Sequence, residues 1–166
     1  IQSNDKYYAT VYLNKFAKLF RNILDSSKQN TVSLSRDLET LKLYIELEKF
    51  RHENKFTAAI EADDELLQDD YKVPPLIVQP FVENAIHHGL LNKIDGDKQL
   101  MIRVSVVNNR IHYLIEDNGV GRAKANAYKQ LNKPSHQSMG MQITTDRTNL
   151  FNQTKNGSVV ITDTIN

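Results

Sequence analysis

The 166-residue sequence predicts an α+β fold, with helices at the amino end followed by a helix and a mixed sheet. Apolar residues recur at helical spacing through the first 50 residues. Later segments alternate apolar and polar residues, as half-buried strands do. The 21 basic and 20 acidic residues nearly balance, which gives no electrostatic case for binding nucleic acid. The absence of cysteine excludes disulfides, thiolate metal sites and cysteine nucleophiles.

Two helices are predicted before residue 53. The first begins at a cap among residues 3–5 and ends near Ser26, and its wide apolar face indicates packing on another helix, from this chain or a second subunit. The second is expected to have Ser35 as its N-cap, with Asp37 and Glu39 favourably placed in its first turn. We expect both helices to serve helical packing.

Strands and loops follow in an order that the local signals set. Residues 56–60 form a short strand, and residues 91–98 a polar loop. Residues 100–107 and 111–116 form a hairpin, because asparagine tolerates positive φ at Asn108-Asn109. Residues 122–137 are polar and interrupted by Pro134, which indicates a mobile segment with one short helix. A helix over 139–152 and a strand over 157–162 complete the prediction.

The stretch from Pro74 to Gly89 carries the most unusual residues. As a helix it has a broad apolar face and an opposite side with short polar groups, where Glu83 lies one turn before His87 and Asn84 one turn before His88. Gly89 is expected to end the helix in a left-handed conformation. A carboxylate, a carboxamide and two imidazoles beside an apolar stripe suggest a polar site, although a half-buried helix with two satisfied histidines explains the same pattern.

Two glycine-bearing motifs follow this helix. Asp117-Asn118-Gly119-Val120-Gly121 places a carboxylate at the end of a strand, with glycines that allow close approach of a ligand to the backbone. An ordinary turn after a strand accounts for the same residues. Ser138-Met139-Gly140-Met141 begins a helix, where backbone amides suit phosphate oxygens.

The ordered set of motifs resembles the ATP-binding domain of sensor histidine kinases, in the superfamily shared with DNA gyrase and MutL. It looks most similar to the LytS-type kinases. Residues 79–89 match their N-box, Gln-Pro-x-Val-Glu-Asn-Ala-Ile-x-His-Gly, at every fixed position. Residues 117–121 match the G1 box, residues 138–147 resemble the G2 region, and residues 34–51 resemble the helix before the catalytic domain. The resemblance implies a two-layer α/β sandwich of the Bergerat type, with a mixed sheet covered by helices on one face.

The resemblance also implies roles for particular residues, with ATP and Mg²⁺ as cofactors. Asn84 would be the Mg²⁺ ligand, and Glu83 the catalytic residue that orients the nucleophile or acts as general base. Asp117 would accept a hydrogen bond from the adenine amino group. His87, where the family often has lysine, would touch phosphate, and His88 would brace the helix end. The remaining nucleotide contacts implied are Gly119, Gly121, Gly140 and Met141.

The same resemblance gives the expected organisation. Residues 1–53 would be the carboxyl-terminal part of a helical dimerisation and phosphotransfer region, and residues 54–166 the catalytic domain without its closing Gly-Thr and strand. The phosphoacceptor motif Pro-His-Phe-x-Phe-Asn is absent and would precede residue 1, so the chain is expected to bind ATP without phosphorylating itself. Expected partners are a second copy, joined through the amino-terminal helices, and a response regulator. The full-length protein is expected to be anchored in the bacterial inner membrane with this part in the cytoplasm.

Several alternatives are weaker. A zinc site of His87, His88 and a carboxylate is disfavoured because adjacent helical residues diverge by about 100°. No Gly-Lys-Ser/Thr occurs, which excludes a P-loop nucleotidase. Another ATPase of the superfamily, such as an anti-sigma serine kinase, fits less well with two leading helices. A degenerate nucleotide-sensing or dimerisation module stays open, because Ser138 replaces the first G2 glycine.

Overall fold

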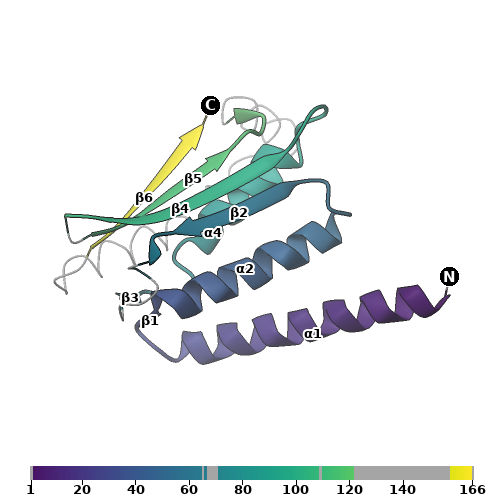
Figure 1. The fold of residues 1–166 in the computed structure, drawn as a ribbon, viewed down its shortest axis with the longest axis horizontal. Coiled ribbons are helices and arrows are strands. Elements are labelled where there is room, and N and C mark those ends of the chain that lie inside the picture. Colours follow the sequence, from purple (N-terminus) through teal and green to yellow (C-terminus); the bar gives the residue numbers. More distant parts are fainter. Residues whose placement is uncertain (1, 65, 67–70, 109, 122–157, 166) are drawn as a thin grey trace, which may run out of the picture.

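Two antiparallel helices lie beside a sheet in the computed structural model, which describes residues 2–64, 66, 71–108, 110–121 and 158–165 (Figure 1). Helix α1 spans Gln2–Ser27 and helix α2 spans Leu34–Arg51. Both predicted amino-terminal helices are therefore confirmed. The N-cap of α2 is Ser33 and not the predicted Ser35, because the extended backbone of Ser33 still belongs to the short strand β1 (Val32–Ser33).

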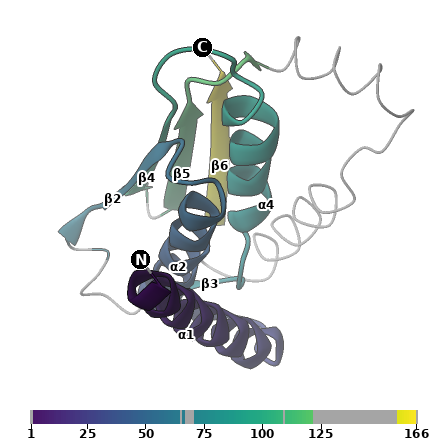
Figure 2. The ribbon, with the colours of Figure 1, turned by 90° about the vertical axis from the view of Figure 1, so that its right-hand side faces the viewer.

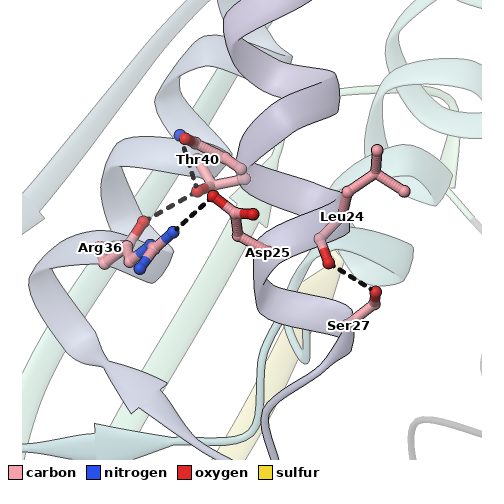
Figure 3. Close-up of polar contacts among 6 residues, drawn as sticks. Leu24, Asp25, Ser27, Arg36 and Thr40 are labelled. Atoms are coloured by element: carbon pink, nitrogen blue, oxygen red, sulfur yellow. Dashed lines mark hydrogen bonds and ion pairs between the residues drawn. The ribbon is translucent and has the colours of Figure 1, made fainter.

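The two helices are joined by apolar and polar contacts. Leu19 of α1 is buried, and Tyr12 and Ile23 pack partly against the same core. Figure 3 shows the polar contacts near the turn, where Arg36 pairs with Asp25 at 3.4 Å. Because the Arg36–Asp25 ion pair is solvent-exposed, the buried apolar residues contribute most of the stability of the contact between the two helices.

A four-stranded mixed sheet forms the other layer, as predicted. Its strands are β2 (Thr57–Ala62), β4 (Gln99–Val107), β5 (Arg110–Asp117) and β6 (Ser158–Ile165), in the order β2-β4-β5-β6. The central hairpin β4–β5 is antiparallel, whereas β2 and β6 run parallel to their neighbours. The predicted hairpin turn is confirmed at Asn108, which has φ +52°, and Asn109 lies outside the described residues. A separate two-stranded sheet pairs β1 with β3 (Lys72–Val73).

The core lies between the sheet and the helices that cover one of its faces (Figure 2). The register pairs Ile102 with Ile115 and Val104 with Tyr113, and all four side chains are buried. Residues on the opposite face of the strands are more exposed. There Arg103 forms ion pairs with Glu61 and Glu116 across three strands. This alternation follows from the period of two in a strand with one buried face.

The helix that carries the unusual polar residues begins later than predicted. Helix α4 spans Gln79–Asn84, and residues 74–78 form an irregular turn. Pro75 disfavours helical geometry at Pro74, and the left-handed backbone of Leu76 interrupts any helix that began at the prolines. Leu76 has φ +58°, and its amide donates a 2.8 Å hydrogen bond to the buried carboxylate of Asp37. Asp37 of α2 therefore fixes the chain where it enters α4.

Helix α4 continues directly into a π-helix, η1, which spans Ala85–Leu90. The amide of Leu91 donates to the carbonyl of Ile86, five residues earlier, at 2.9 Å. The prediction that Gly89 ends the helix in a left-handed conformation is wrong, because Gly89 lies inside η1 and is not among the positive-φ glycines. The wider π turn re-aims the side chains of residues 85–90, and such turns are frequent at functional sites.

The other predictions divide between the described and undescribed parts of the chain. The strand predicted over 157–162 is confirmed as β6, which extends to Ile165. The segment 122–137 and the helix 139–152 lie outside the described residues. Within the part of the chain that is described, no helix is long and apolar enough to cross a membrane.

Candidate functional site

The helix motif that ends at Gly89 meets the turn motif of residues 117–121 at the end of η1. The two motifs are about 30 residues apart in the sequence. A Cβ added to Gly119 would lie 2.3 Å from the carbonyl carbon of Gly89. A Cβ added to Gly89 would lie 2.5 Å from Oδ1 of Asp117. The amide of Val120 also donates a 3.2 Å hydrogen bond to the carbonyl of Gly89. Glycine is therefore required at position 119 by the close approach of the Gly89 backbone, and a side chain at position 89 would displace the Asp117 carboxylate.

The carboxylate of Asp117 is oriented by this contact. Its Oδ1 accepts a 2.9 Å hydrogen bond from the amide of Gly119 and lies against Gly89. Gly121 has φ +74°, a backbone conformation that residues with a side chain rarely adopt. The turn after β5 therefore holds a carboxylate in a set direction beside the helix that carries Glu83 and Asn84.

Glu83 and His87 share one face of the α4–η1 helix, as predicted, and that face meets α2. The buried side chain of Tyr44 on α2 lies close enough to Glu83 for this carboxylate to act on its hydroxyl. Burial, together with the negative charges of Glu83 and Glu48, raises the pKa of Tyr44 far above its ordinary value. Tyr44 thus stays protonated at all physiological pH values and is able to donate a hydrogen bond to Glu83. The side chain of Asn84 is half-buried.

His87 lies against two residues at the end of α2. Its Nε2 is 3.1 Å from Oε2 of Glu48, and Nε2 of His52 is 3.5 Å from the same oxygen. The two imidazole rings form an edge-on pair with centroids 5.8 Å apart. Glu48 is only 7% exposed, so this group of side chains lies at a largely buried junction between α2 and η1.

The end of η1 is held by a residue that the sequence analysis did not consider. The Nδ2 group of Asn92 donates hydrogen bonds to the backbone carbonyls of His87 and His88, at 3.3 and 3.1 Å. These carbonyls belong to the last turn of the helix, where no later helical residue supplies a backbone amide as donor. Asn92 therefore braces the helix end.

The structure gathers most of the predicted site residues and leaves some outside. Asp117, Gly119 and Gly121 lie at one end of the α4–η1 helix, and Glu83, Asn84 and His87 lie along it. Gly140 and Met141 fall outside the described residues. Sequence reasoning missed Tyr44, Glu48 and His52 because they act on the site from a separate helix. These three residues follow one another at intervals of four, and this helical spacing could have indicated that they share one face of the helix.

A protein-family model indicates the class of protein that the first part of the chain resembles. Residues 1–56 match the family model described as histidine kinase. This match covers α1, β1 and α2 and ends at the buried residue Phe56. The helical first third of the chain therefore resembles that of histidine kinases.

Particular relatives extend this similarity. The sensor histidine kinase/phosphatase LytS of Staphylococcus aureus, from strains Mu50, N315 and USA300, is 34% identical over 115 residues. The aligned stretch is 68% of this chain but 19% of the relative. The chain thus spans about a fifth of the length of the curated relatives that it matches. Similarity to sensor histidine kinases is therefore established for most of this chain, and covers a small part of those proteins.

Proposed function

We propose that this chain is the ATP-binding catalytic portion of a two-component sensor histidine kinase, with an ATP-binding domain of the type shared with DNA gyrase and MutL. The γ-phosphoryl group would pass to a histidine outside this sequence and then to an aspartate of a response regulator. The observation that carries the proposal is the packing of Asp117 and Gly119 against Gly89, at the end of the helix that holds Glu83 and Asn84. The full-length protein would be membrane-anchored.

The residues present suit a magnesium nucleotide. The amide oxygen of Asn84 is a hard ligand of the kind that Mg²⁺ accepts beside phosphate oxygens and water. The oriented carboxylate of Asp117 can accept a hydrogen bond from the adenine amino group, where guanine has a carbonyl. Magnesium-bound ATP would supply the group that is transferred. The close backbone approach of Gly119 to Gly89 brings the Asp117 carboxylate to the end of the helix.

The described residues would act mainly by positioning, as is general in phosphoryl transfer. A hydrogen bond donated by Tyr44 would favour one orientation of the Glu83 carboxylate. In that orientation Glu83 would accept a proton from the incoming histidine, or orient that histidine. His87 would contact phosphate only after its imidazole leaves Glu48. Gly140 and Met141 complete the proposed phosphate contacts.

Replacing Asn84 tests the metal role. Asn84→Ala should remove the strengthening of ATP-analogue binding by Mg²⁺, a loss of about 10- to 100-fold, because a ligand oxygen is gone. Calorimetric titration of a non-hydrolysable ATP analogue, with and without Mg²⁺, measures this. Asn84→Asp keeps an oxygen ligand and should keep the Mg²⁺ dependence. If Asn84→Ala still responds to Mg²⁺ as the wild type does, Asn84 is not the ligand.

The same proposal includes a homodimer formed through α1. Leu13, Phe16, Phe20 and Leu24 recur at helical spacing and are 46–62% exposed, although α2 covers the other apolar side of α1. The rings of Phe16 and Phe20 stack with centroids 6.4 Å apart. A helix that is apolar on two sides needs a second helical partner. The corresponding face of a second copy would supply it.

A double substitution tests this interface. Phe16→Ser with Phe20→Ser should convert a dimer to a monomer in sedimentation equilibrium, since each phenylalanine buried contributes about 1.5–3 kcal/mol. Ile94→Ser is the matched control, because Ile94 is 84% exposed in the loop after η1. A wild-type chain that sediments as a monomer at high concentration would contradict the proposal.

A further inference from the structure

Three side chains from two helices converge on one point at the junction of α2 and η1. Glu48 and His52 come from the end of α2, and His87 comes from η1. One ligand atom from each residue lies within 4.8 Å of the other two. The side chain of Glu48 is 10% exposed, and those of His52 and His87 are 25% and 34% exposed, so the point of convergence is partly shielded from water and can be reached from one side.

Two of the polar atoms at this point lack a hydrogen bond of good geometry to any described residue. They are the buried Oε2 of Glu48 and Nε2 of His52, which lie 3.5 Å apart, and Oε2 also lies 3.1 Å from Nε2 of His87. The other oxygen of Glu48, Oε1, lies 3.6 Å from the exposed guanidinium of Arg51. Leaving a buried carboxylate oxygen unsatisfied is costly, so an additional group that binds all three atoms would stabilise the junction.

Two of the three separations among these atoms fit a tetrahedral cation, and the third, between the two histidines, is at most 4.8 Å. Ligands at about 2.0–2.1 Å from Zn²⁺ lie roughly 3.3 Å from one another in a tetrahedron. The observed separations from Oε2 of Glu48 are 3.1 Å to His87 and 3.5 Å to His52. Two imidazole nitrogens and one carboxylate oxygen suit zinc and similar transition cations, whereas Mg²⁺ and Ca²⁺ prefer oxygen ligands.

We propose that Glu48, His52 and His87 form a binding site for a divalent transition cation of the Zn²⁺ class, with the fourth position open to water. The site is separate from the Mg²⁺ position proposed at Asn84 and does not depend on nucleotide binding. It differs from the zinc site that the sequence disfavoured, because His87 pairs with His52 of another helix and not with its neighbour His88. A bound cation would clamp η1 to α2 and hold the His87 imidazole away from phosphate.

Titration of the untagged 166-residue chain with ZnCl₂, without nucleotide, tests the site. The wild type should bind one Zn²⁺ per chain and melt at a higher temperature when loaded. His52→Gln should weaken binding by at least about 100-fold, since loss of a ligand costs more than the roughly 10–100-fold of an outer-shell change. Glu48→Gln should do the same. When MgCl₂ replaces ZnCl₂, any shift in melting temperature should be the same in the wild type and in His52→Gln.

The matched control is His112→Gln, a half-buried histidine on β5 outside the cluster, which should bind Zn²⁺ within about twofold of the wild type. Circular dichroism melting of each variant without metal shows whether it is folded. Co²⁺ provides a second readout, because tetrahedral Co²⁺ absorbs visible light and this absorption should be absent in His52→Gln. Equal Zn²⁺ affinity in wild type and His52→Gln, or no stoichiometric binding by the wild type, would overturn the proposal. Neither result would bear on ATP binding.

Discussion

Gly119→Ala should lower the stability of the chain by about 3 kcal/mol, the upper end of what an inserted methyl costs in a packed site. The new Cβ would lie 2.3–2.5 Å from three backbone atoms of Gly89, and backbone cannot turn aside as a long side chain can. For a chain of this size the melting temperature should fall by roughly 6–12 °C. ATP-analogue affinity should fall with it, because the turn after β5 would move away from η1.

Gly96→Ala separates this effect from a general cost of replacing glycine. Gly96 has φ +84°, and a Cβ there would meet only Cε of Lys93, at 3.8 Å. The left-handed backbone alone should cost about 1–2 kcal/mol, with no change in ligand affinity. Thermal melts and titrations of both variants give the comparison. If Gly119→Ala melts no lower than Gly96→Ala, the close packing of the two motifs is not a determinant of the fold.

Asp117→Asn should reduce ATP-analogue affinity roughly 10- to 150-fold, the equivalent of about 1.5–3 kcal/mol for a hydrogen bond to a charged group. An amide oxygen can still accept the hydrogen bond from Gly119, so the turn should stay in place and the melting temperature should change little. The acceptor for the adenine amino group would be replaced by an amide with its own donors. In Asp117→Asn the affinity for the ATP analogue should therefore fall while the stability stays nearly constant, whereas in Gly119→Ala both should fall.

Glu116→Gln is the matched control for Asp117→Asn. Glu116 is the preceding residue on β5 and pairs with Arg103 on the opposite face of the sheet. Its substitution removes one carboxylate from the same strand and should leave analogue affinity unchanged. Isothermal calorimetry with an ATP analogue, and with the GTP analogue as a control, distinguishes the variants. Unchanged affinity in Asp117→Asn would remove Asp117 from the adenine site.

Local signals predicted the parts of the fold that depend on neighbouring residues. The hairpin at Asn108 and the alternation of buried residues in β4 and β5 are both set by short-range patterns. The apolar face of α4 and η1 was also correct, with Val82 and Ile86 fully buried. These features need no knowledge of what the chain packs against.

The failures arise where distant parts of the chain meet. Gly89 was interpreted as a helix terminator, but a side chain at this position would meet the carboxylate of Asp117. The positive φ of Leu76 depends on a hydrogen bond to Asp37, 39 residues away. His87 also lies 3.1 Å from Glu48 of α2, a contact that the sequence did not predict. Each of these roles follows from tertiary contacts, which helical periodicity does not contain.

Calorimetric titration of the wild-type chain with a non-hydrolysable ATP analogue tests the proposed function most directly. The titration is made with and without Mg²⁺, and with the corresponding GTP analogue. We predict binding that is stronger with Mg²⁺ and selective for adenine. Absence of binding by a folded chain would contradict the nucleotide site and leave a dimerisation module.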